Sequence, residues 1–200
     1  NYIGTNADGT ARLRNNAVGV LMRSGASSNR IGTDGNGEGD LAERNVISGN
    51  GREGVKLLDG GTDQNVIAGN FIGTDLSGTR RLGNGLQGLE IRQGAANRIG
   101  TDGDGVSDEA ERNLISANGG TGVQIVNGAN NLLAGNFIGT DVTGTLDFGT
   151  DNNGIIVSGD QAVGNRIGTD GDGIADESEG NLISGNDSFG IVLADGASET

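Results

Sequence analysis

Short runs of alternating apolar and polar residues recur along the chain, and each run begins with a glycine. The runs lie 32 to 36 residues apart and are as follows: Gly19–Arg23, Gly54–Leu58, Gly88–Arg92, Gly122–Val126, Gly154–Ser158 and Gly190–Ala194. Alternation with a period of two over so few residues, bounded by glycine and asparagine, predicts β-strands rather than helices.

Two further phrases with the pattern Asn-x-Ile separate these strands. The phrase Asn-Arg-Ile-Gly-Thr-Asp begins at Asn29 and returns 68 residues later at Asn97 and again at Asn165. Self-similarity at a fixed period indicates a repeat architecture in which each repeat stacks on the next. We therefore predict a solenoid of about six coils, each with three short strands, in an all-β fold.

Stacking the coils in register predicts columns of equivalent residues. The interior column consists of isoleucines: Ile3, Ile47, Ile72, Ile115, Ile138 and Ile183. Two asparagine columns follow from the repeat: Asn29, Asn65, Asn97, Asn131 and Asn165, and then Asn1, Asn45, Asn70, Asn113, Asn136 and Asn181. A third column alternates amide and acid: Asn6, Asn50, Asp75, Asn118, Asp141 and Asn186. Asparagine suits sharp corners, and stacked amides can hydrogen-bond along a column.

This pattern resembles the right-handed parallel β-helix, and the Asn-x-Ile and Ile-Gly-Thr-Asp phrases resemble repeat regions of large bacterial cell-surface and secreted proteins. The resemblance covers essentially the whole chain, so we expect residues 1–200 to form a single β-helix domain, as part of a longer protein. It also implies an extracellular or cell-surface location. The general preference for right-handed crossovers between parallel strands agrees with this handedness.

Composition narrows the classes of partner. Glycine accounts for 41 of 200 residues, while the chain has four Phe, one Tyr and no Trp, which suits narrow repeated layers joined by tight turns. The formal net charge of −14 argues against nucleic acid as a partner, because a phosphate backbone requires clusters of Lys and Arg. The chain has no Cys, and no apolar run approaches the length of a membrane span.

Insertions leave alternate coils at two different corners, and one type is acidic. Counted from its first Asp, each acidic loop places oxygen-bearing side chains at positions 1, 3, 7 and 10, with Glu at position 8 in the last two loops. The candidate ligands are Asp34, Asn36, Asp40 and Glu43 in the first loop; Asp102, Asp104, Asp108, Glu109 and Glu111 in the second; and Asp170, Asp172, Asp176, Glu177 and Glu179 in the third.

Calcium is the cation that these acidic loops favour, because it takes six to eight oxygen ligands from a flexible loop. The spacing resembles a shortened form of the Asp-x-Asp-x-Asp-Gly loops of the dockerin and thrombospondin type 3 families, with the third Asp and the closing Glu displaced. We expect the second and third loops to bind better than the first. Repulsion between the stacked loops would cost stability unless cations, or Arg44 and Arg112 beside two of the loops, neutralise it. The alternative is that these loops are solvated turns.

Catalysis has little support in the sequence. The chain has no His, the commonest general base, and Lys56 beside Glu90 is best explained as a cross-strand ion pair. The sequence therefore favours a non-catalytic structural or adhesive segment that contacts flanking domains or further copies through its ends, or a glycan or cell-surface partner. The alternative is a carbohydrate-active β-helix module: a polysaccharide lyase, a glycoside hydrolase or a glycan binder.

Overall fold

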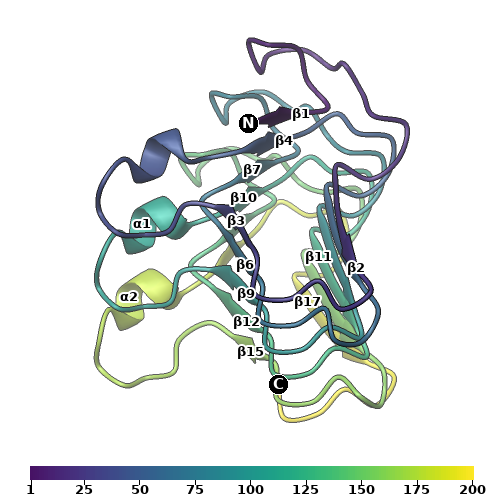
Figure 1. The fold of residues 1–200 in the computed structure, drawn as a ribbon, viewed down its shortest axis with the longest axis vertical. Coiled ribbons are helices and arrows are strands. Elements are labelled where there is room, and N and C mark those ends of the chain that lie inside the picture. The colour runs from purple at the N-terminus through teal and green to yellow at the C-terminus, as the bar shows by residue number, and fades with distance from the viewer.

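The computed structural model describes residues 1–200, and the chain forms a solenoid with three parallel sheets (Figure 1). The longest strands build one six-stranded sheet, here called the long sheet. Its strands are β2 (Val20–Arg23), β5 (Val55–Leu58), β8 (Leu89–Arg92), β11 (Val123–Val126), β14 (Ile155–Ser158) and β17 (Ile191–Ala194). These are the strands that the glycine-led runs predict, so the all-β parallel β-helix is confirmed.

The two Asn-x-Ile phrases form the other two sheets. The five-stranded sheet contains β3 (Arg30–Gly32), β6 (Val66–Ala68), β9 (Arg98–Gly100), β12 (Leu132–Ala134) and β15 (Arg166–Ile167). The third sheet, with six two-residue strands, contains β1 (Tyr2–Ile3), β4 (Val46–Ile47), β7 (Phe71–Ile72), β10 (Leu114–Ile115), β13 (Phe137–Ile138) and β16 (Leu182–Ile183). Every strand pairs with the equivalent strand of the next coil, so the interior is a set of parallel columns.

The interior column of isoleucines is confirmed. Ile47 pairs in register with Ile3 and Ile72, and the pairing continues through Ile115 and Ile138 to Ile183. The side chains of the middle coils, such as Ile72 and Ile115, are fully buried. Because each coil adds the same small apolar side chains to the same columns, the core fills a narrow space without large aromatic residues.

Two of the three predicted polar columns are also confirmed as hydrogen-bonded ladders. In the first, the side-chain amide of each asparagine donates to Oδ1 of the next, from Asn29 to Asn65 to Asn97 to Asn131 to Asn165, at 3.0 Å in every step. The second ladder runs in the same way from Asn1 to Asn181, with distances of 2.7 to 3.1 Å. These ladders satisfy buried amides that would otherwise cost free energy.

The predicted membership of the third column is wrong at every second position. The ladder contains Asn15, Asn50, Asn84 and Asn118, with amide-to-Oδ1 distances of 2.9 to 3.0 Å, followed by Thr150, which donates to Asn186. The residues wrongly placed in it are Asn6, Asp75 and Asp141. Each of these precedes an insertion and uses Oδ1 to accept backbone N–H groups four and five residues ahead. The insertion shifts the ladder position to the far side of the loop, and residue spacing alone did not show this.

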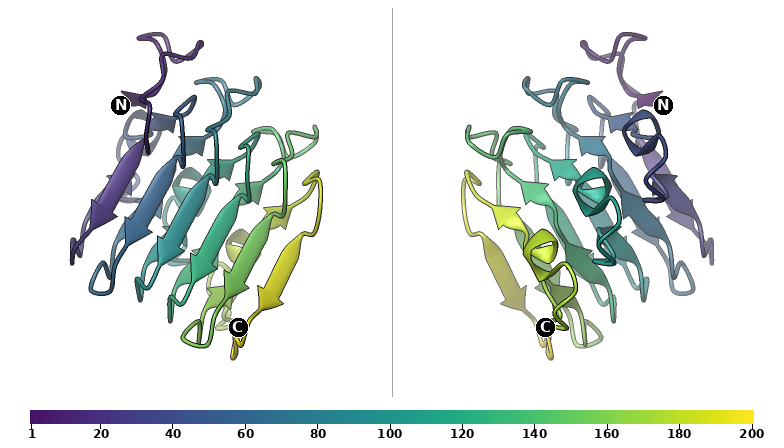
Figure 2. Two further views of the ribbon diagram at one scale, coloured as in Figure 1. Left: turned by 90° about the vertical axis from the view of Figure 1, so that its right-hand side faces the viewer. Right: turned by 90° about the vertical axis from the view of Figure 1, so that its left-hand side faces the viewer.

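Three short helical turns interrupt the otherwise all-β chain: η1 (Asp40–Ala42), α1 (Asp108–Glu111) and α2 (Asp176–Glu179). They belong to the acidic loops and stack above one another on one side of the solenoid, as the right-hand view of Figure 2 shows. The other insertions project from the corner beyond the third sheet (Figure 1). None of the helices has the length and hydropathy needed to span a bilayer.

Candidate cation-binding loops

The acidic loops begin directly after strands β3, β9 and β15, whose stacking sets the loops one above another. In the second loop, Ser107 adopts a left-handed conformation with φ of 56°, and α1 begins at the next residue. Residues three apart on a helix share one side, so this turn brings Asp108 and Glu111 together. Ala175, with φ of 52°, has the same place in the third loop, before α2.

Positions 1, 7 and 10 converge in all three loops. Carboxylate oxygens from the three residues lie within 4.8 Å of one another in each of the following clusters: Asp34, Asp40 and Glu43; Asp102, Asp108 and Glu111; and Asp170, Asp176 and Glu179. Calcium–oxygen distances are about 2.3–2.6 Å, so oxygens on opposite sides of one ion lie at about this separation. The loops therefore hold three carboxylates at a spacing that suits a hard cation.

Positions 3 and 8 lie outside these clusters. At position 3, Oδ1 accepts the backbone N–H of the residue two ahead, at 2.7 Å from Asn36 to Glu38, from Asp104 to Val106 and from Asp172 to Ile174. These contacts are Asx turns that shape the loop, and all three position-3 side chains are exposed. At position 8, Glu109 and Glu177 are also exposed, and they lie on a different side of the helical turn from positions 7 and 10.

An arginine from the preceding strand enters two of the clusters. Nη1 of Arg98 lies 2.8 Å from Glu111 and 3.3 Å from Asp102, and Arg166 pairs with Asp170 at 2.5 Å and Glu179 at 3.6 Å. The equivalent Arg30 makes no ion pair and contacts only the carbonyl of Thr33, at 3.5 Å. The first cluster is thus the one that no arginine neutralises, a difference between the loops that the sequence did not suggest.

Of the two ways to neutralise the loops, cations or Arg44 and Arg112, the arginines are not used, since neither forms an ion pair. Each guanidinium stacks on a phenyl ring instead, Arg44 at 4.1 Å from the centroid of Phe71 and Arg112 at 4.2 Å from that of Phe137. The chain turns after the helical turn, so the residue next to position 10 points toward the third sheet rather than toward the carboxylates.

Successive loops interlock through the glycine at position 2. A Cβ atom at Gly35 or Gly103 would clash with the carboxylate of Glu111 or Glu179 in the next loop, and both glycines have positive φ. This packing leaves Glu111 with 1% of its surface exposed, and burial raises its pKa despite the hydrogen bond from Arg98. In the first loop, hydrogen bonding from Ser107 of the second loop lowers the pKa of Asp40.

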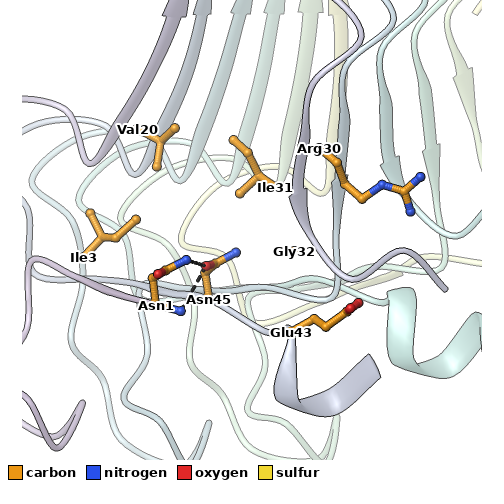
Figure 3. Close-up of a pocket in the computed structure, with 8 residues that line it drawn as sticks. All are labelled: Asn1, Ile3, Val20, Arg30, Ile31, Gly32, Glu43 and Asn45. Carbon is orange, nitrogen blue, oxygen red and sulfur yellow. Dashed lines mark hydrogen bonds between the residues drawn. The ribbon is translucent and has the colours of Figure 1, made fainter. Parts of the chain in front are cut away.

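The largest cavity, of about 430 Å³, lies between the first and second acidic loops, where Asp40, Leu41, Ser107 and Ala110 line it. A cavity of about 300 Å³ opens at the N-terminal end of the solenoid, where Ile3, Val20 and Ile31 point toward one another (Figure 3). Arg30 and Glu43 border it, and Asn1 bonds to Asn45 across its edge. These isoleucines and Val20 are the first members of the interior columns, so this cavity is the open end of the core, with polar side chains around its edge.

A second charged cluster lies on the outer face of the long sheet. Nζ of Lys56 lies 2.5 Å from Oε2 of Glu90 and 2.9 Å from Oε1 of Glu53, and both carboxylates are 1–2% exposed. Arg92 pairs with the other oxygen of Glu90 at 2.6 Å. Lys56 and Glu90 are register partners on β5 and β8, so the predicted cross-strand pair is confirmed, with Glu53 as an additional member that the sequence did not suggest.

Comparisons with known proteins give a limited result. No protein-family model matches the chain, and no curated protein matches it. Among solved structures, the chain is similar to the crystal structure of the periplasmic alginate epimerase AlgG, with a TM-score of 0.44 and 18% identity. The match covers 90% of this chain and 36% of the epimerase chain. A mutant of the same epimerase gives a TM-score of 0.43 at 19% identity, over 89% of this chain and 36% of that chain.

Proposed function

We propose that this chain is a non-catalytic structural segment of a larger extracellular protein, and that calcium bound by its acidic loops stabilises it. The observation that carries the proposal is the threefold convergence of positions 1, 7 and 10 within 4.8 Å, at the same place in alternate coils. A repeated cation site on one side of a solenoid stabilises the stack of coils, because an ion that binds only the folded loop favours the folded state.

The structural role rests on the ladders and the core. Buried asparagine ladders and an isoleucine column run through the coils without a break that would open a cleft. The main polar cluster outside the loops, around Lys56, is closed by its own ion pairs. The cavity at the N-terminal end exposes Ile3, Val20 and Ile31, and this suits contact with another coil, from a flanking domain or from a second copy of the chain.

The three loops differ in whether an arginine already pairs with their carboxylates, and this difference predicts their relative affinities for calcium. In the first loop, Asp34, Asp40 and Glu43 have no arginine among them, so a calcium ion would be the principal counter-charge there. In the second and third loops, calcium has to compete with Arg98 or Arg166 for the same carboxylates. We therefore expect the first loop to bind calcium most tightly.

Thermal unfolding followed by circular dichroism tests the proposal. Calcium at about one hundred times its Kd should stabilise the fold by about 2.7 kcal/mol relative to EDTA, which for a domain of this size raises Tm by about 5–10 °C. Replacing Asp40, Asp108 and Asp176 together with Asn should remove most of this calcium-dependent increase. The matched control replaces exposed Asp8, Asp160 and Asp187 with Asn, which changes the net charge equally and should preserve the increase.

The variant Arg98→Met should increase the effect of calcium on Tm, whereas the aspartate variants should remove it. The variant leaves Glu111 and Asp102 without their guanidinium, so its Tm in EDTA should fall below that of the wild-type protein. Calcium should then raise its Tm by more than it raises that of the wild type. Equal melting temperatures with calcium, magnesium and EDTA for all of these proteins would show that the loops are solvated turns.

A further inference from the structure

Arg44 and Arg112 are two half-buried cations without a carboxylate partner in a chain of net charge −14. Both are held in the same way. Nε of Arg44 donates to the carbonyl of Gly69 at 3.1 Å, Nε of Arg112 donates to that of Gly135 at 3.0 Å, and each guanidinium stacks on a phenyl ring. The Nη atoms of both side chains make no hydrogen bond within the protein, so their N–H groups can donate to a ligand.

The two arginines line one cavity of about 80 Å³ on the outer face of the third sheet. Phe71, Leu114 and Phe137 are register neighbours on β7, β10 and β13 and form its apolar floor. Since Arg44 covers the first ring and Arg112 the last, the guanidinium groups are about two strand spacings, or about 10 Å, apart. Leu114 lies between them, so the cavity is apolar below and positively charged at both ends.

We propose that this cavity binds the carboxylate group of a small organic acid, either free or as a uronic acid residue of a polysaccharide. A guanidinium pairs with a carboxylate through two parallel hydrogen bonds, so the carboxylate can pair with one of the two arginines while the positive charge of the other attracts it across the apolar floor. The cation–π contacts and the carbonyl bonds fix both guanidinium groups in advance, which reduces the entropy lost on binding. The proposal is independent of calcium.

Glu109 and Val142 form the walls of the cavity and limit what it accepts. The carboxylate of Glu109 lies more than 4.0 Å from both guanidinium groups, so it makes no ion pair with them and repels a second negative charge. A monoanionic carboxylate is therefore favoured over sulfate or phosphate, which bring twice the charge into an acidic protein. The third repeat has Gly180 in place of the arginine, so only this one pair is built.

The Nε–Hε resonances of the arginines in a ¹⁵N-labelled sample report on binding directly. Titration with propionate, and separately with glucuronate, at constant ionic strength should shift the signals of Arg44 and Arg112 along one saturable curve. Sulfate should shift them by less than half as much. Tighter binding of glucuronate than of propionate assigns the site to sugar acids, and the reverse assigns it to small organic acids that have no sugar ring.

Three variants separate this site from general charge pairing. Arg112→Gln should weaken binding about 10-fold or more, as expected for loss of a charged hydrogen bond. Glu109→Gln should strengthen it about two- to fivefold while both arginines and their supports remain. Arg23→Gln, which removes an exposed arginine from the long sheet, should have no effect. Equal shifts at exposed arginines, an unchanged affinity in Glu109→Gln, or equal affinity for sulfate would overturn the proposal.

Discussion

Replacing Lys56 with methionine is expected to destabilise the fold by about 3–5 kcal/mol at pH 8, because the change leaves two buried carboxylates without their shared cation. Glu53 and Glu90 are 2% and 1% exposed, and Lys56 lies between them at 2.9 Å and 2.5 Å. Oε2 of Glu90 has no other partner for its charge. Arg92 reaches the opposite oxygen of Glu90 and compensates only in part.

The pH dependence of this loss has a defined sign. Burial by itself would raise the pKa of Glu53, but hydrogen bonds from Lys56 outweigh it and hold the pKa below its ordinary value. Burial likewise opposes the charge of Lys56, but Glu90 and Glu53 outweigh it and raise the pKa of the lysine. The ion pair between Glu53 and Lys56 therefore stabilises the wild-type protein between about pH 5 and pH 10. This contribution is lost as the pH falls below or rises above that window.

In Lys56→Met, burial is left to raise the pKa of Glu53, so protonation should recover stability as the pH falls from 8 to 5. Urea denaturation at both pH values measures the difference in unfolding free energy between variant and wild type. The matched control, Arg23→Met, removes an exposed cation from the same sheet and should cost less than about 0.5 kcal/mol. A loss below about 1 kcal/mol, or one that does not shrink at pH 5, would contradict the assignment of a buried ion cluster.

Asn97→Ala is expected to cost about 2–4 kcal/mol, through loss of the ladder bonds in the middle of the stack. Oδ1 of Asn97 accepts from both the backbone and the side-chain amide of Asn65, at 2.9 and 3.0 Å, and its own amide donates to Asn131 at 3.0 Å. Alanine leaves the backbone N–H of Asn65 without an acceptor at a buried position, since Asn97 is only 1% exposed.

Asn29→Ala is the matched control for this prediction, because Asn29 occupies the same ladder at its exposed end. Its Oδ1 receives no bond from a preceding coil, so the loss should be about 1 kcal/mol or less. Thermal and urea unfolding of both variants give the comparison. Similar losses at the two positions would mean that stacking of the coils, rather than satisfaction of buried amides, accounts for the asparagine columns.

Much of the fold could be predicted because the repeat places identical residues at equivalent positions. The glycine-led strands, the Ile47 column and the Asn97 ladder all follow from residue spacing and from the period-two pattern. The third ladder could not be predicted in the same way, because an insertion separates Asp75, which the spacing selects, from Asn84, which forms the ladder. A periodic pattern locates residues reliably only where no insertion interrupts it.

The candidate site was predictable in its residues but only partly in its geometry. The sequence grouped all the acids of each loop, whereas the structure separates Asp108 and Glu111 from Glu109 by a single helical turn. That turn was foreseeable from the helix-favouring Asp-Glu-Ala-Glu segment. The role of Arg98 was not, because its contact with Glu111 spans the whole loop and depends on the path of the backbone.

Isothermal titration of calcium into the chelator-treated protein tests the central claim most directly. We predict saturable binding of one to three ions per chain, weaker heats with magnesium, and loss of the tightest site in Asp34→Asn with Asp40→Asn, the double variant of the first loop. Heats no larger than those of dilution, for a protein whose circular dichroism shows that it is folded, would contradict the claim that the acidic loops bind and are stabilised by calcium.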